Sequence, residues 1–194
     1  TCSGSVPGEE VAMFLSNRRT HDALKQNRLY EMLSCDPDYM DAYGLELVAG
    51  RGFSEDYGDD VNKLVINETA ARTLGYTDYE SVIGEEISVE TIEEPMQVIG
   101  VVKDYHQQAL NRNYTPIMLF HKDKIDWIPQ RYISIVMKPG DSLELVSQIS
   151  EIWTTYFADS SFDYFFLDQF YDRQYRQDEA FGVLMGGFTG LAIF

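Results

Sequence analysis

Asp104 and His106 have the residue types and the spacing for proton transfer. They lie two positions apart in VIGVVKDYHQQAL, residues 98–110, just after an apolar run of strand character. A carboxylate and an imidazole can act as general acid and base, and both would project from the same face of an extended strand. No nucleophile lies between them, however, and the chain has no G-x-S-x-G elbow of a serine hydrolase. The pattern favours a structural turn over a catalytic pair.

Metal and phosphate sites also lack their usual patterns. Neither H-E-x-x-H nor C-x-x-C occurs, and the three histidines are far apart: His21, His106 and His121. The acidic runs at 36–41 and 55–60 lack the ligand spacing of a calcium loop, which favours solvated acidic loops. Gly50 and Gly52 flank Arg51 without the remaining residues of a P-loop, so ATP binding is not expected. We therefore predict no catalytic residue, no metal and no cofactor.

The composition predicts a folded, acidic protein that does not bind nucleic acid. The chain has 194 residues, of which 44% are hydrophobic and 13% aromatic, enough to enclose a core. Its net charge of −17 repels phosphate backbones and disfavours electrostatic binding to an anionic lipid surface. Any link to a membrane must therefore come from apolar sequence.

Hydrophobic periodicity and turn residues predict a mixed architecture. We expect a strand at 28–36, a short helix capped by Asp36 and stopped by Gly44, and a strand at 64–66 that leads into a helix from Asn67 to Gly75. The further expected elements are a hairpin of 83–90 with 96–105, an edge strand at 114–120, a strand at 132–138, a helix at 141–157 and a returning strand at 162–167. The fold class is α+β.

The C-terminal residues 180–194, AFGVLMGGFTGLAIF, carry no charge. As a helix they would be about 22 Å long, short of the roughly 30 Å that a membrane span needs. A buried helix is one interpretation, but four glycines in fifteen residues favour a transmembrane helix that continues beyond the sequence. Cys2 and Cys35 are either two free thiols or one bridge.

Five segments, in this order along the chain, together resemble the extracytoplasmic, or periplasmic, core domain of MacB/FtsX-type ABC transporter permeases. They are SGSVPGE at 3–9, DPDYMDAYGLELVAGRGFS at 36–54, VINETAARTLGY at 65–76, IGEEI at 83–87 and VIGVVKDYHQQAL at 98–110. The resemblance covers most of the chain.

This resemblance implies a two-lobed domain outside the cytoplasmic membrane. Residues 1–32 with 131–167 would form a porter-like lobe of mixed β-α-β units, and 33–130 an inserted sabre-like lobe. Residues 168–194 would form a helix that leads into a truncated transmembrane segment of a multi-pass protein. The domain would be non-catalytic and would transmit ATP-driven conformational change in efflux or in lipoprotein and envelope processes.

The implied partners are a cytoplasmic ABC ATPase, a second permease subunit in a dimer, and a periplasmic adaptor or envelope protein. The polar exit of the strand at 98–102 supplies candidates for contact with a partner, namely Tyr105, His106 and Gln107. The aromatic residues between Tyr156 and Tyr175 fit a core or a subunit interface, or else a carbohydrate platform. An extracytoplasmic module that senses or binds a ligand is therefore the alternative function.

Overall fold

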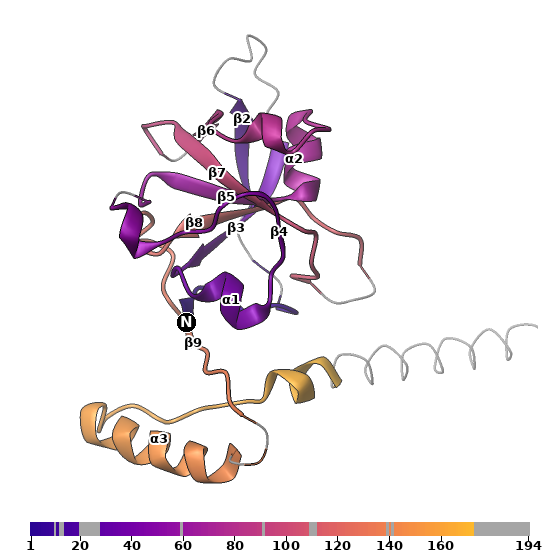
Figure 1. The fold of residues 1–194 in the computed structure, drawn as a ribbon. Coiled ribbons are helices and arrows are strands. Elements are labelled where there is room, and N and C mark those ends of the chain that lie inside the picture. Colours follow the sequence, from indigo (N-terminus) through magenta and orange to yellow (C-terminus); the bar gives the residue numbers. More distant parts are fainter. Residues whose placement is uncertain are drawn as a thin grey trace, which may run out of the picture. The chain divides into compact units, whose positions relative to one another are not determined.

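The computed structural model describes residues 1–9, 11, 14–19 (backbone alone), 28–58, 60–90, 92–108, 112–138, 140 and 142–172. The chain divides into two compact units, residues 1–135 and 136–194. In the first unit the strands are β1 (Cys2–Ser3), β2 (Phe14–Arg19), β3 (Arg28–Cys35), β4 (Leu47–Gly50), β5 (Lys63–Asn67), β6 (Glu86–Val89), β7 (Met96–Val102), β8 (Ile117–His121) and β9 (Tyr132–Ile133). Its helices are α1 (Tyr39–Tyr43) and α2 (Glu68–Leu74), with short 3-10 turns at Glu55–Tyr57 and Glu80–Val82, and the second unit contains α3 (Ser142–Tyr156) (Figure 1).

The nine strands of the described residues form one sheet that closes on itself. Its order is β2-β6-β7-β5-β8-β3-β1-β9, and β2 also pairs with β3. Strands β2, β6, β7, β5, β8 and β3 therefore complete a ring, while β4 adds to β7 outside it. The pairs β3–β8 and β5–β7 are parallel and the others are antiparallel. Closure leaves the ring strands without a free edge along their paired lengths.

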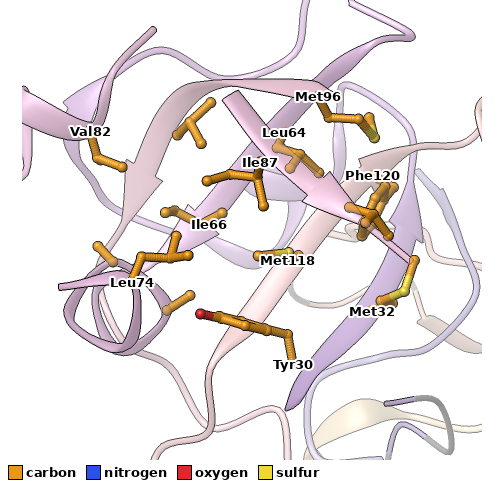
Figure 2. Packing of buried hydrophobic residues seen from close by; sticks show 14 of the residues in the cluster. Tyr30, Met32, Leu64, Ile66, Leu74, Val82, Ile87, Met96, Met118 and Phe120 are labelled. Carbon is orange, nitrogen blue, oxygen red and sulfur yellow. The ribbon is translucent and has the colours of Figure 1, made fainter. Parts of the chain in front are cut away.

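Alternate residues of the ring strands form the main core. Buried members from five strands are Tyr30, Met32, Leu64, Ile66, Ile87, Val89, Met96, Val98, Met118 and Phe120. Figure 2 shows that the labelled side chains among them point toward one another between the strands. Helix α2 adds Leu74 and the turn at 80–82 adds Val82 to the same cluster. The period-two spacing of these residues shows that alternate side chains of each strand point into this cluster.

The opposite face of the same strands is covered by a second buried cluster. Strands β3, β5 and β8 contribute Leu33, Cys35, Val65, Ile117 and Leu119 to it. Helix α1 and the loop after β4 supply its cover with Tyr39, Met40 and Phe53. Strands buried on both faces explain why β5 and β8 have continuous apolar sequences instead of alternating ones.

A bulge in β7 decides which of its residues face each cluster. Leu64 lies opposite Val98, but Val65 lies opposite Gly100, so Ile99 is the extra residue. Ile99 packs in the second cluster, whereas Val98 and Val101 pack in the first. The Arg51 N–H donates to the Ile99 carbonyl at 2.9 Å, which brings the Arg51 backbone directly against Gly100.

Several predicted elements are confirmed. Strand β3, helix α1, the β6–β7 hairpin and helix α3 lie where the sequence predicts them. The unit of β5 and α2 is also confirmed: the Asn67 Oδ1 accepts the Ala70 N–H at 2.9 Å, and Gly75 ends the helix with a left-handed φ of 96°. The fold class, α+β, is correct.

Four predictions about strands and caps were wrong. Residues 117–121 form a central strand between β5 and β3, not an edge strand, because Pro116 precedes the ladder and does not interrupt it. Of 132–138 only β9 is strand, and 162–167 pairs with no described strand. Asp36 does not cap α1, since its carboxylate accepts the Thr1 hydroxyl and the Cys2 N–H instead.

The structure also bears on the expected cysteine bridge, the expected C-terminal membrane helix and the expected lobes. Both cysteines are free thiols, so the bridge between them is absent. Residues 167–172 are helical, and the expected transmembrane continuation through residue 194 lies outside the described residues. Within the described residues no helix combines the length and apolar character that a membrane span requires. The assignment of the two lobes stays a prediction. Its boundary at 32/33 falls inside β3, whereas the chain divides into its two compact units after residue 135.

The close approach at Gly100 predicts a steep cost for adding one methyl group. In Gly100→Ala the new Cβ would overlap the Arg51 carbonyl oxygen, which is backbone and cannot move aside. We expect a loss of roughly 1–3 kcal/mol or more in the free energy of unfolding, measured by urea denaturation. The control is Gly52→Ala, whose Cβ meets only the flexible end of Met40, with an expected cost under about 1 kcal/mol. Equal losses in both variants would contradict this account.

Candidate functional site

The loop at 103–108 follows β7 and contains the three site residues that the sequence suggests for a partner contact, Tyr105, His106 and Gln107. Its first residue, Lys103, is exposed and pairs with Glu46 at 3.1 Å. The Lys103 N–H also donates to the Glu46 carbonyl at 2.8 Å, which ties the loop to the chain just before β4. The loop therefore begins as a fixed continuation of the sheet.

Asp104 anchors the first turn of α2. Its carboxylate accepts the Thr69 N–H and the Thr69 hydroxyl, both at 2.8 Å, and an Arg72 N–H at 2.5 Å. The Asp104 side chain is only 7% exposed, and its own N–H donates to Glu68 at 3.0 Å. A carboxylate at the start of a helix satisfies free N–H groups and lies at the favourable end of the helix dipole. Its hydrogen bond raises the pKa of Arg72.

Tyr105 and His106, the next two residues, have different surroundings. Tyr105 is partly buried and packs against the second core cluster, which includes Tyr39. Burial raises the pKa of Tyr39 well above the usual tyrosine value. The His106 ring stands 4.5 Å from the ring of Tyr114, which is 47% exposed. Asp104 and His106 therefore have separate partners, and the sequence preference for a structural turn fits this arrangement.

Gln107 is buried and holds the N-terminal segment. The residue is only 1% exposed. Its side-chain amide donates to the Ser5 hydroxyl, the Val6 carbonyl and the Glu9 carbonyl at 3.1, 2.8 and 3.2 Å. The Gly8 N–H donates back to the Gln107 carbonyl at 2.9 Å. Of the three predicted interface residues, Gln107 thus serves a contact within the chain. Their role in an interface with a partner stays a prediction.

A second polar cluster, around Asp60, was missed by the sequence analysis. Asp60 accepts two N–H groups of the Arg51 guanidinium, each at 2.7 Å, and the Ser54 N–H at 2.9 Å. Its side chain is 4% exposed, so the run at 55–60 is not a wholly solvated acidic loop. The guanidinium also lies 4.2 Å from the centre of the Tyr57 ring. The hydrogen bonds from Arg51 hold the pKa of Asp60 below its usual value.

The remaining candidates for chemistry do not assemble. His121 lies 3.6 Å from Asp123 and packs its ring against Phe53, apart from the His106–Tyr114 pair. His21 is outside the described residues. Burial strongly raises the pKa of the Cys35 thiol, which keeps it protonated. Within the part of the chain that the structure describes, no group of three or more His, Cys, Asp or Glu side chains could hold a metal ion.

The chain matches a known protein family over most of its length. Residues 3–151 match the family described as the MacB-like periplasmic core domain. The chain belongs to this family. It is therefore a periplasmic domain of a MacB-like ABC transporter permease, and the family is a transporter domain and not a catalytic one. No curated protein matches the chain significantly.

Solved structures share the fold at low sequence identity. The periplasmic region of MacB from Actinobacillus actinomycetemcomitans is 16% identical with a TM-score of 0.56, and the match covers 80% of this chain and 66% of that one. This chain thus spans just under two thirds of that region. A domain of a putative permease from Porphyromonas gingivalis is 16% identical with a TM-score of 0.51, covering 88% and 89%. The extracellular domain of the ABC-type transporter YknZ from Gram-positive bacteria is 14% identical with a TM-score of 0.53, covering 77% and 78%.

The anchoring role of Asp104 predicts a loss of stability on substitution. In Asp104→Asn the side chain loses its charge toward Arg72 and places an amide among hydrogen-bond donors. We expect unfolding in urea to show a loss of about 1–3 kcal/mol. The matched control is His106→Asn in the same loop, with an expected change under about 0.5 kcal/mol. A larger loss for His106→Asn than for Asp104→Asn would contradict the anchor.

The ion pair of Arg51 with the buried Asp60 predicts a pH dependence of stability. Because the pKa of Asp60 is lower in the folded than in the unfolded chain, the stabilisation is complete above the usual aspartate pKa of about 3.9. It is lost as the pH falls through the lowered folded pKa. At pH 7 the free energy of unfolding of the wild-type chain should exceed that of Asp60→Asn by about 1–3 kcal/mol. This difference should shrink between about pH 4 and pH 2.

The control for this pH dependence is Asp56→Asn, which removes an exposed carboxylate from the same loop. Denaturation at each pH should give equal stabilities for this variant and the wild-type chain, within about 0.5 kcal/mol. A difference between wild type and Asp60→Asn that stays constant down to pH 2 would disprove the role of the ion pair.

Proposed function

We propose that this domain transmits conformational change, driven by ATP hydrolysis in the cytoplasm, to the extracytoplasmic side of the membrane. Permeases of the MacB/FtsX type work with cytoplasmic ABC ATPases, and the family match supports this placement. In the proposal the domain carries out no chemistry of its own. Its work is the movement of a stable protein body during efflux, or during lipoprotein or envelope processes.

One observation carries the proposal: the two ends of the first unit, at Thr1 and Ser134, lie side by side. The Thr1 amino group donates to the Ser134 carbonyl at 3.0 Å, and the Ser134 N–H donates to the Thr1 carbonyl at 2.8 Å. Strand β1 continues this contact by pairing with β9. A displacement of either segment therefore acts on the same corner of the sheet.

The closed ring of strands suits a body that moves without deforming. A strand in a ring is paired on both sides, and the strands enclose a core of large buried side chains. Packed cores resist continuous deformation, so motion passes through such a unit to its surface. The proposed partners at that surface are a second permease subunit and a periplasmic adaptor or envelope protein.

Pulsed electron spin resonance on the full-length permease with its ATPase tests the proposal. The variant background is Cys2→Ser with Cys35→Ala, since both native thiols are free. Single spin labels at the exposed positions Thr77 and Asp126 would report distances between two permease copies. We expect ATP binding to shift at least one of these distances by on the order of 5 Å, because subunit rotations and helix shifts in switching proteins have this size.

The control pairs the permease with an ATPase variant that cannot bind ATP, where no shift is expected. Identical distance distributions with and without ATP, at both labelled positions, would contradict transmission by this domain. The absence of any distance between labels would contradict the dimer. Saturable thermal stabilisation by one class of small ligand would support the alternative, a sensing module, since a ligand that binds only the folded state raises its stability.

A further inference from the structure

We propose that the loop at 103–108 is a junction that couples the N-terminal segment at residues 5–9, called the strap below, to helix α2. Gln107 is the positioning residue of this junction. Its contribution to transmission rests on the proposed function, but the junction itself is a property of the folded chain. Within the loop, Gln107 binds the strap and Asp104 binds α2.

The strap is held by the side-chain nitrogen of Gln107, while the Oε1 of the same amide is buried without a hydrogen-bond partner among the described residues. The Gln107 amide nitrogen lies within 3.2 Å of three oxygens, those of Ser5, Val6 and Glu9, so its two hydrogens are shared among three acceptors. An amide turned the other way would place its oxygen against the Val6 and Glu9 carbonyls. Burial of Ser5, Val6 and Gln107 excludes water as a substitute partner. The strap and the loop are therefore held in one register.

A second contact joins the strap to strand β9. The Tyr132 hydroxyl donates to a Glu9 carboxylate oxygen at 2.8 Å. Burial and this hydrogen bond raise the pKa of Tyr132, so its hydroxyl remains a donor at neutral pH. The strap thus links the corner where β1 and β9 pair to the loop after β7.

The loop has little freedom to absorb a displacement of the strap. Three positions before Gln107, Asp104 is bonded to Thr69 and Arg72 of α2. Tyr105 between them packs in the second core cluster, and the Gln107 N–H donates to the Tyr105 carbonyl at 3.2 Å. Moving Gln107 therefore requires that the Tyr105 packing or the Asp104 bonds change. The bonds of Asp104 are the ones that order the first turn of α2.

Hydrogen exchange on the full-length protein, without ATP, tests the junction. In Gln107→Leu we expect exchange to become about tenfold faster both in the strap and at residues 68–71 of α2, as for the loss of one buried hydrogen-bonding group. The matched control is Gln97→Leu on β7, which loses bonds to Lys63 and Gly84 at a different place. It should leave both segments unchanged.

A double variant separates coupling from a merely structural effect. If Gln107 acts on α2 through Asp104, exchange at 68–71 in Gln107→Leu with Asp104→Asn should equal that in Asp104→Asn alone. Multiplied effects of the two substitutions would overturn the proposal. So would faster exchange in the strap alone, or an even increase across β5 and β8.

If Gln107→Leu does not fold, Gln107→Asn provides the same test. This substitution keeps an amide but shortens the side chain by one methylene, so the nitrogen no longer reaches all three acceptors. Faster exchange in the strap and at 68–71 in Gln107→Asn would support the junction, and faster exchange in the strap alone would overturn it. Because ATP is absent, these outcomes are independent of the spin-label distances, which test transmission by the whole domain.

Discussion

The first unit of the structure depends on how strand β7 is shared among its neighbours. Its first residues pair with β6, its last residues pair with β4, and β5 runs along its other edge. The bulge at Ile99 lets one strand serve both core clusters, and Gly100 leaves room for the Arg51 backbone. The ring, the loop after β4 and the exit loop at 103–108 all take their positions from this strand.

Buried polar groups then fix the connections between the elements. Asp60 orders the loop after β4, Asp104 orders the start of α2, and Gln107 orders the strap. Both carboxylate oxygens of Asp60 and of Asp104 accept hydrogen bonds, as polar groups in an apolar interior need if they are not to cost stability. The Gln107 nitrogen has three acceptors, whereas its Oε1 is buried without a hydrogen-bond partner among the described residues. Under the proposed function, these connections would carry a displacement from one element of the domain to the next.

Much of this fold could be predicted, because its local signals agree with its tertiary structure. The apolar run before Asn67, the cap at Asn67 and the stop at Gly75 define a strand and a helix through neighbours in sequence. The β6–β7 hairpin and α3 were predicted for the same reason. The predictions failed where long-range pairing decides, as for β8, whose central place depends on β3 and β5.

The sequence by itself determined the fold class and most element positions, because periodicity, caps and turns act over a few residues. The family followed from the resemblance of five segments to known members. Only the tertiary structure decided what the polar residues do. Gln107 meets Ser5 across 102 positions and Asp104 meets Arg72 across 32, and such partners depend on which strands pair. For this reason a set of residues that the sequence assigns to a partner interface contains one, Gln107, whose side chain is buried against its own chain.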